Sequence, residues 1–127
     1  MLKTLLFLFL TFQLYGAQVF WHDSYKDAQE EALDTHKPML IFMSQEGCGA
    51  CEYMQNVVLV DKKISDYLDK HYITAHLDIH SNDAPMELQI PVTPVFHFLN
   101  SDGSELRDAI IGGKKASLFL KAITLKE

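Results

Sequence analysis

The segment MLIFMSQEGCGAC, residues 39–51, carries the strongest signals for the fold of this chain. Its first five residues form an unbroken apolar run, which predicts a strand buried on both faces, as in a sheet that lies between helices. The segment 44–47 is polar and ends this strand. A helical pattern then runs from Gly49 to about Val58. The sequence therefore places its two cysteines, Cys48 and Cys51, where a buried strand meets the start of a helix.

This position favours a reactive thiolate at Cys48. A sulfur at the start of a helix faces unpaired N–H groups and the positive end of the helix dipole, which stabilise the anion by about 0.3 to 1 kcal/mol. Cys51 lies one turn inside the helix, so it is within reach of Cys48 but less accessible. It can therefore resolve a mixed disulfide by intramolecular attack. We predict that Cys48 is the attacking nucleophile and that the pair is a reversible two-electron switch.

Metal binding is the main alternative for this pair. Structural zinc takes four ligands, and the chain has no second pair of cysteines. His76 and His80 fall on or near a predicted strand rather than beside the helix start. Thiolates also select Cu(I), so a copper chaperone stays open as a further alternative. We expect no metal and no dissociable cofactor.

Composition and charge limit the class of protein. The chain has 127 residues, of which 48% are hydrophobic and 22% charged, as in a single globular domain. Its formal net charge is −6, so nothing attracts it electrostatically to nucleic acid or anionic lipid. Two cysteines this close in sequence do not form the framework of a disulfide-stapled fold. Their role is therefore expected to be chemical.

Residues 1–17 read as a secretory signal peptide. Lys3 precedes an apolar run over residues 5–14, and the small residues Gly16 and Ala17 follow. Such a run is shorter than the roughly 20 residues of a spanning helix. We therefore expect a signal peptide over 1–17, one domain over 18–127 and a periplasmic location, with an uncleaved anchor as the alternative. Export places the cysteines where thiols tend to be oxidised.

Periodicity along the rest of the chain predicts alternating helices and strands. Apolar residues at helical spacing, with capping or turn residues at the ends, predict helices, and alternating or continuous apolar residues predict strands. The turn at 100–103 predicts that the last two strands pair antiparallel. In order, we predict helix 24–36, strand 39–43, helix 49–58, helix 61–70, strand 72–79, helix 84–88, strand 95–99, strand 105–111 and helix 116–125. The second and third helices can also be one kinked helix.

With these features in register, the sequence resembles the thioredoxin superfamily over residues 20–125. The most similar branches are exported thioredoxin-like proteins and the C-terminal domain of transmembrane thiol:disulfide interchange proteins. The matching features are Trp21, Lys37-Pro38, Cys48-Gly49-Ala50-Cys51, Leu77-Asp78, Thr93-Pro94 and Gly112. The resemblance implies an α/β, thioredoxin-like fold whose central mixed four-stranded sheet is flanked by helices. It also implies that Pro94 is cis and lies against the cysteines, and that Thr93 pairs with an extended substrate.

Two positions depart from the pattern of that family. Many thioredoxins carry a buried Asp, which assists proton transfer, where this chain has Phe42. Glu46 is the nearest carboxylate before the cysteines, and we hypothesise that it or water is the proton relay; a merely solvated Glu46 is the alternative. Gly47 replaces an aromatic residue that often precedes the first cysteine.

Charge around the cysteines favours a reducing direction. No Lys, Arg or His occurs from Gln45 to Asn56, whereas Glu46 and Glu52 add negative charge. A less stabilised thiolate makes the disulfide relatively favoured, which lowers the reduction potential. We therefore predict an exported thiol:disulfide oxidoreductase that reduces client proteins.

The resemblance and the compartment suggest the partners. We expect disulfide-containing exported proteins as clients, a membrane thiol–disulfide electron donor, no nucleic acid, and a monomer. The alternatives are a disulfide oxidase or isomerase, and a metallochaperone or redox-inert binding module on the same fold.

Overall fold

The computed structural model describes residues 19–124. The predicted signal peptide, residues 1–17, lies outside the described residues and stays a prediction. Over residues 19–124, no helix combines the length and the apolarity that crossing a bilayer requires.

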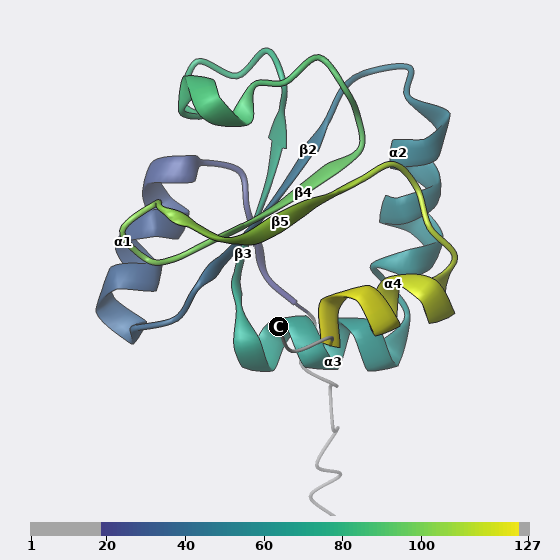
Figure 1. Cartoon of the computed structure of the whole chain (residues 1–127), viewed down its shortest axis with the longest axis horizontal. Coiled ribbons are helices and arrows are strands. Elements are labelled where there is room, and N and C mark those ends of the chain that lie inside the picture. The colour runs from purple at the N-terminus through teal and green to yellow at the C-terminus, as the bar shows by residue number, and fades with distance from the viewer. Residues whose placement is uncertain (1–18, 125–127) are drawn as a thin grey trace, which may run out of the picture.

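Strands and helices alternate along the chain, as predicted (Figure 1). The elements are β1 (Trp21–His22), α1 (Tyr25–Thr35), β2 (Met39–Ser44), α2 (Gly49–Tyr53), the π-helix η1 (Met54–Val58), α3 (Lys62–His71), β3 (Ile73–Asp78), the 3-10 helix η2 (Met86–Leu88), β4 (Val95–Leu99), β5 (Glu105–Ile111) and α4 (Ala116–Thr124). The predicted helix at 84–88 is therefore only one 3-10 turn.

The strands form one mixed sheet in the order β1-β3-β2-β4-β5. β3 is parallel to β1 and β2, whereas β4 is antiparallel to β2 and β5. We expected four strands, and the fifth is the two-residue β1, whose Trp21 and His22 pair with Thr74 and Ala75. Two residues are too few to show the alternation by which a strand is recognised in a sequence.

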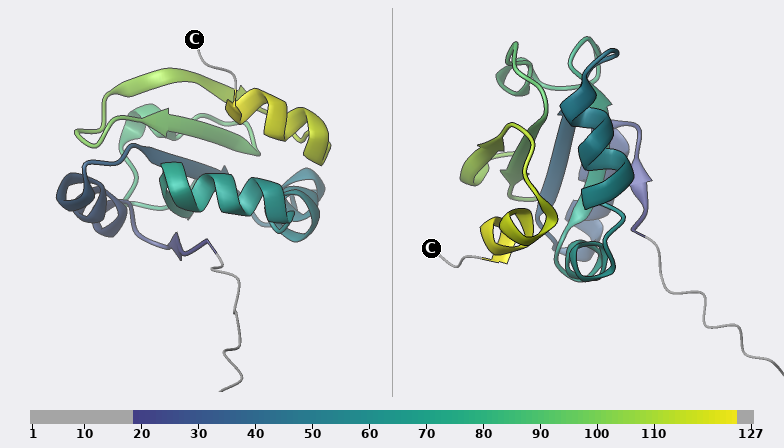
Figure 2. Two further views of the ribbon diagram at one scale, coloured as in Figure 1. Left: turned by 90° about the horizontal axis from the view of Figure 1, so that it is seen from below. Right: turned by 90° about the vertical axis from the view of Figure 1, so that its right-hand side faces the viewer.

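β2 is the central strand, and it is buried on both faces as predicted. All five residues from Met39 to Met43 are at most 1% exposed. α1 covers one face of the sheet, and α2, α3 and α4 cover the other (Figures 1 and 2). Two separate core clusters fill these spaces: Ala28 and Ile41 belong to the cluster under α1, and Phe42 and Phe119 to the other.

Local hydrogen bonds explain where the helices begin and end. The Ser24 side chain accepts a hydrogen bond from the Asp27 N–H at 3.3 Å and caps the start of α1. The helix ends at Thr35, and the C-cap residue His36 is in the left-handed region with φ 56°. Asp61 caps α3 by accepting from the N–H groups of Lys63 and Ile64. This cap makes α3 a separate helix rather than a continuation of α2 and η1.

Candidate active site: the Cys48–Cys51 disulfide

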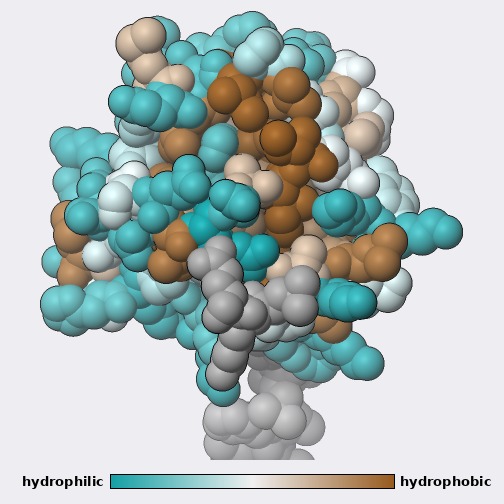
Figure 3. Space-filling view, viewed as in Figure 1, coloured by the Kyte–Doolittle hydropathy of each residue, from teal (hydrophilic) through white to brown (hydrophobic). Residues whose placement is uncertain are grey.

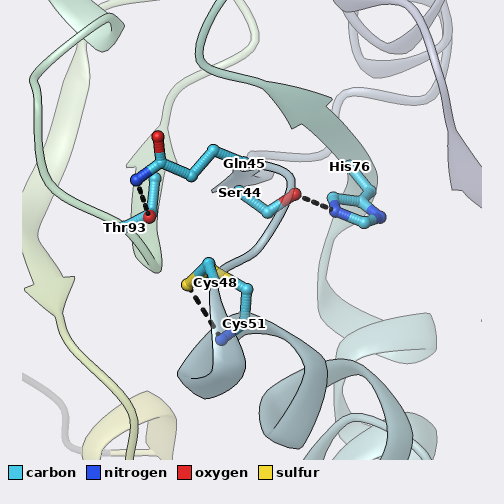
Figure 4. The surroundings of a disulfide bond; sticks show 6 residues. All are labelled: Ser44, Gln45, Cys48, Cys51, His76 and Thr93. Carbon is cyan, nitrogen blue, oxygen red and sulfur yellow. Dashed lines mark hydrogen bonds between the residues drawn. A yellow bond between two sulfur atoms is a disulfide. The ribbon is translucent and has the colours of Figure 1, made fainter.

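Cys48 and Cys51 form a disulfide where the loop after β2 leads into α2 (Figure 4). Their Cα atoms are 5.2 Å apart. Cys48 is the N-cap of α2 with extended backbone, and its Sγ accepts a hydrogen bond from the Cys51 N–H at 3.1 Å. The two residues therefore lie as the sequence predicts, one before the helix and one in its first turn.

The two sulfurs differ in accessibility. Cys51 is 3% exposed and belongs to the core cluster that contains Phe42 and Met54, whereas Cys48 is only partly buried. A client can reach the sulfur of Cys48 but not that of Cys51. This asymmetry separates an attacking sulfur from a resolving one.

The loop before β4 lies beside this disulfide. The Thr93–Pro94 peptide bond is cis, in agreement with the resemblance, and Pro94 is buried. The Gln45 side-chain amide donates to the Thr93 Oγ1 at 3.0 Å, so it joins this loop to the loop that carries Cys48 (Figure 4). Sequence reasoning missed Gln45, because its partner is 48 residues away.

A second loop packs against α2. A Cβ atom added to Gly113 would lie 3.5 Å from the Cβ of Ala50, and the Lys114 N–H donates to the Met54 Sδ at 3.3 Å. The backbone of this loop at Gly113 and Lys114 is therefore close to α2 and the π-helical turn that follows it.

Glu46, the predicted proton relay, is exposed on the loop before Cys48. Within residues 19–124, no side-chain hydrogen bond or ion pair holds its carboxylate. Its role therefore stays a prediction.

A histidine that the sequence analysis did not select lies on the same face of the sheet. The Ser44 Oγ and the His76 Nε2 are 2.6 Å apart, and the His76 ring stacks on Phe42 with centroids 4.4 Å apart. Burial lowers the pKa of His76, and the negative charge of Asp78 opposes this effect. His76 is therefore a neutral, hydrogen-bonded base at neutral pH.

A cavity of about 450 Å³ opens beside His76, between the β1 edge of the sheet and α3. Its lining residues are Val19, Trp21, Phe42, Gln55, Leu59, Val60, Lys62, Ser65, Asp66 and His76. Across the part of the chain that the structure describes, no three His, Cys, Asp or Glu side chains are grouped so as to hold a metal ion.

A family model described as thioredoxin-like matches residues 20–101. The chain belongs to the thioredoxin-like family. No curated protein matches the sequence. The matched residues include the two cysteines and the cis proline.

Solved structures share this thioredoxin-like fold. A putative disulphide-isomerase from Bacteroides thetaiotaomicron is 22% identical, with a TM-score of 0.71 over 84% of this chain and 90% of the other. A thioredoxin from Thermus thermophilus is 23% identical, with a TM-score of 0.69 over 83% and 85%. The oxidised C-terminal domain of DsbD from Neisseria meningitidis is 22% identical, with a TM-score of 0.64 over 82% and 97%. At these identities the likeness shows the fold alone.

The family, the fold and the disulfide support the same class of chemistry. A thioredoxin-like sheet presents a C-x-x-C pair whose sulfurs are joined at the start of a helix. These features support a thiol–disulfide oxidoreductase.

Proposed function

We propose that this thioredoxin-like protein is exported and that it reduces disulfides in client proteins. The observation that carries the proposal is the unequal exposure of the two joined sulfurs, with Cys48 accessible and Cys51 3% exposed. The disulfide in the structure corresponds to the oxidised form of the protein, the state that follows the reduction of a client.

The reaction has two exchange steps. In the reduced protein, the Cys48 thiolate attacks a client disulfide, forms a mixed disulfide and releases one client sulfur as a thiolate. Cys51 then attacks the Cys48 sulfur, which closes the Cys48–Cys51 disulfide and releases the second client sulfur. The client gains two electrons and the protein loses two. An electron donor, which we propose to be a membrane thiol–disulfide protein, then restores the dithiol.

The client is expected to bind along the loop that ends in Pro94. The exposed side chains Val92 and Ile111 flank this loop, and the Gly112 N–H donates to the Pro94 carbonyl at 2.8 Å. Figure 3 shows apolar side chains gathered in the upper middle of one face, with hydrophilic side chains around them. An extended client segment can pair with the backbone at Thr93 and cover apolar surface with its own side chains.

The reducing direction follows from the charge near Cys48. Glu46 and Glu52 are exposed close to the cysteines, and no basic residue occurs from Gln45 to Asn56. These carboxylates oppose the helix dipole and destabilise the Cys48 thiolate, so that the disulfide form is relatively favoured.

Equilibration with glutathione tests the direction. We expect a reduction potential closer to about −270 mV, as in reducing members of the fold, than to about −120 mV, as in strong oxidants. A potential at the oxidising end would make the protein an oxidase and overturn the proposal. Tight, stoichiometric binding of Cu(I) or Zn by the reduced protein, without any reduction of a disulfide substrate, would favour a metallochaperone instead.

Export is tested separately with a reporter. Residues 1–17 fused to an enzyme that is active only outside the cytosol should give activity, because Lys3 and the apolar run form the pattern of a signal peptide. Replacing Leu8 by Arg in the same fusion is the matched control, and it should abolish that activity. Equal activity of both fusions would contradict export.

A further inference from the structure

The loop at residues 112–114 contacts two segments that flank the disulfide. The Gly112 N–H donates to the Pro94 carbonyl at 2.8 Å, so the loop begins on the segment that carries the cis proline. A Cβ added to Gly113 would lie 3.5 Å from the Cβ of Ala50, one of the two residues between the cysteines. In Figure 1 the chain runs beside α2 here before it turns into α4. The 112–114 loop therefore bridges the cis-proline loop and the cysteine helix.

Met54 supplies the hydrogen bond that joins this loop to the cysteine helix. Its Sδ accepts from the Lys114 N–H, with 3.3 Å between the two atoms. Over residues 19–124, no other hydrogen bond connects residues 112–114 to α2 or η1. A thioether is a weak acceptor, but this N–H is partly buried, so an acceptor within the protein matters more than it would at a solvated surface.

Met54 is itself held firmly in the fold. It is 0% exposed and belongs to the same core cluster as Cys51. It is also the residue at which α2 passes into the π-helix η1, and its carbonyl accepts from the Leu59 N–H, five residues on, at 2.8 Å. Single π-helical turns are frequent at functional sites. Because the side chain is packed on all sides, the position of its sulfur is fixed relative to the cysteine helix.

The other buried methionines show that burial alone does not produce such a bond. Met39 and Met43 are also 0% exposed, and both belong to the core cluster under α1. Neither sulfur has a hydrogen bond among the described residues, whereas the sulfur of Met54 accepts one from a loop 60 residues away. Met54 thus has a polar contact in addition to its packing.

We propose that Met54 is a positioning residue for client binding, and that its thioether holds the 112–114 loop against the cysteine helix. Ile111, which is 56% exposed, immediately precedes this loop, so its place beside the cis-proline loop depends on the same anchor. Met54 takes no part in the transfer of electrons, because it acts through the loop. The inference rests on the proposed function in that it concerns the binding of a protein client.

Amide hydrogen exchange of the Lys114 N–H tests the anchor directly. Met54→Leu keeps a buried apolar side chain of similar volume but has no acceptor, so the Lys114 amide should exchange about two- to fivefold faster. Met39→Leu is the matched control, because it makes the same substitution at an equally buried site at the start of β2. It should leave the exchange of Lys114 unchanged. Unchanged exchange in Met54→Leu would overturn the proposal.

Steady-state kinetics measures the consequence for a client. With insulin as the protein probe, Met54→Leu should raise KM about two- to fivefold and leave kcat unchanged, since the loop is less well positioned but the sulfurs are intact. Dithiobisnitrobenzoate is a small disulfide that does not need the loop, so it should react with the reduced variant at the rate of the wild type. Met39→Leu should match the wild type with both probes. Equal slowing of Met54→Leu with both probes would contradict a role in positioning the client.

Two substitutions of Lys114 separate its backbone from its charge. Lys114→Pro removes the N–H that donates to Met54, whereas Lys114→Ala keeps this N–H and removes only the cation. The proline variant should raise KM for insulin as Met54→Leu does, and the alanine variant should not. Because Met54→Leu and Lys114→Pro break the same bond, the double variant should raise KM no more than Lys114→Pro alone. Additive effects, or an equal rise in KM for Lys114→Ala, would overturn the proposal.

The outcomes also distinguish this inference from the proposed function. If the wild type reduces insulin but Met54→Leu keeps its KM and its exchange at Lys114, the positioning role is refuted and the proposed function stands. If the wild type reduces neither insulin nor dithiobisnitrobenzoate, the proposed function fails, and faster exchange at Lys114 in Met54→Leu would still confirm the anchor. Thermal unfolding of each variant confirms that it is folded, and the Lys114 variants cover the case in which Met54→Leu does not fold.

Discussion

The two faces of the sheet use the same strands for different purposes. Under α1, the strands present mainly aliphatic side chains, which pack against the small residues Ala28 and Ala32 of the helix. On the other face, the strands present Phe42, Phe96 and Phe98, and the buried sulfur of Cys51 packs into this aromatic cluster. Alternation along each strand thus assigns one set of residues to packing and the other to the surroundings of the disulfide.

Two histidines, one on each face of the sheet, illustrate this difference between the faces. His76 and His97 are both half-buried, and burial lowers the pKa of each. His76 faces the side of the disulfide and is hydrogen-bonded to Ser44, whereas the Nε2 of His97 has no hydrogen-bond partner among the described residues. His76 is thus paired with a side-chain hydroxyl, whereas His97 has a backbone hydrogen bond with Leu88 and an Nε2 without a partner among the described residues.

Substitution of the resolving cysteine should give the largest effect. We expect Cys51→Ser to lower the turnover of a disulfide substrate by at least about 10³-fold, because the mixed disulfide at Cys48 is then not resolved. Mass spectrometry should show the protein joined covalently to its client. Turnover close to that of the wild type would mean that exchange does not run through Cys51.

Ile41→Ala is the comparison on the α1 face. Ile41 is fully buried on β2, and its truncation should cost about 2 to 5 kcal/mol of unfolding free energy, since it leaves a cavity. The rate of exchange per folded molecule should stay that of the wild type. A loss of rate similar to that of Cys51→Ser would show that the two faces are not separate in function.

The sequence was enough to predict most of the helices and strands on both faces of the sheet. The apolar run at 39–43, the Ser24 and Asp61 caps and the turn at 100–103 are local signals, and the structure has β2, α1, α3 and the β4–β5 hairpin where these signals place them. The resemblance supplied the cis form of Pro94, which no local signal indicates.

Features that depend on register were not predictable in this way. β1 exists only because it pairs with β3, and the π-helical turn at Met54–Val58 has the same apolar spacing as an α-helix would. The bond between Ser44 and His76 depends on which residues of β2 and β3 lie side by side. Such contacts need the strand order, which the sequence alone does not give.

A smaller effect should come from loss of the hydrogen bond between Gln45, on the loop before Cys48, and Thr93, on the loop before β4. Gln45→Ala removes the amide that donates to Thr93 at 3.0 Å, and a typical hydrogen bond contributes about 0.5 to 1.5 kcal/mol. We therefore expect KM for a protein client to rise about two- to tenfold, because the loop that receives the client is less well positioned. The measurement is steady-state kinetics at fixed pH.

Gln29→Ala is the matched control for this loss. The Gln29 side chain donates to the Ser101 carbonyl at 3.4 Å, and it joins α1 to the β4–β5 hairpin, on the α1 face. Its removal should leave KM unchanged. An equal rise in KM for both variants would trace the effect to general loosening of the fold.

The smallest effect should be a pH dependence of the free energy of unfolding, to which a histidine on each face contributes. Burial lowers the folded-state pKa of His76 and of His97 below the ordinary value of about 6.5. Between the lowered value and about 6.5, the unfolded chain binds more protons than the folded one, so the free energy of unfolding rises with pH. This contribution is complete above about pH 6.5 and is lost as the pH falls through the lowered pKa values.

Denaturant unfolding between about pH 5 and 7 measures this slope, which is at most about 1.4 kcal/mol per pH unit for each histidine. His76→Gln and His97→Gln should each reduce the slope, and the double variant should reduce it further. The slope responds to the burial of a histidine on either face of the sheet. If His97→Gln left the slope unchanged, burial of that histidine would not be what links stability to pH, and only the face that carries His76 would contribute to the pH dependence of stability.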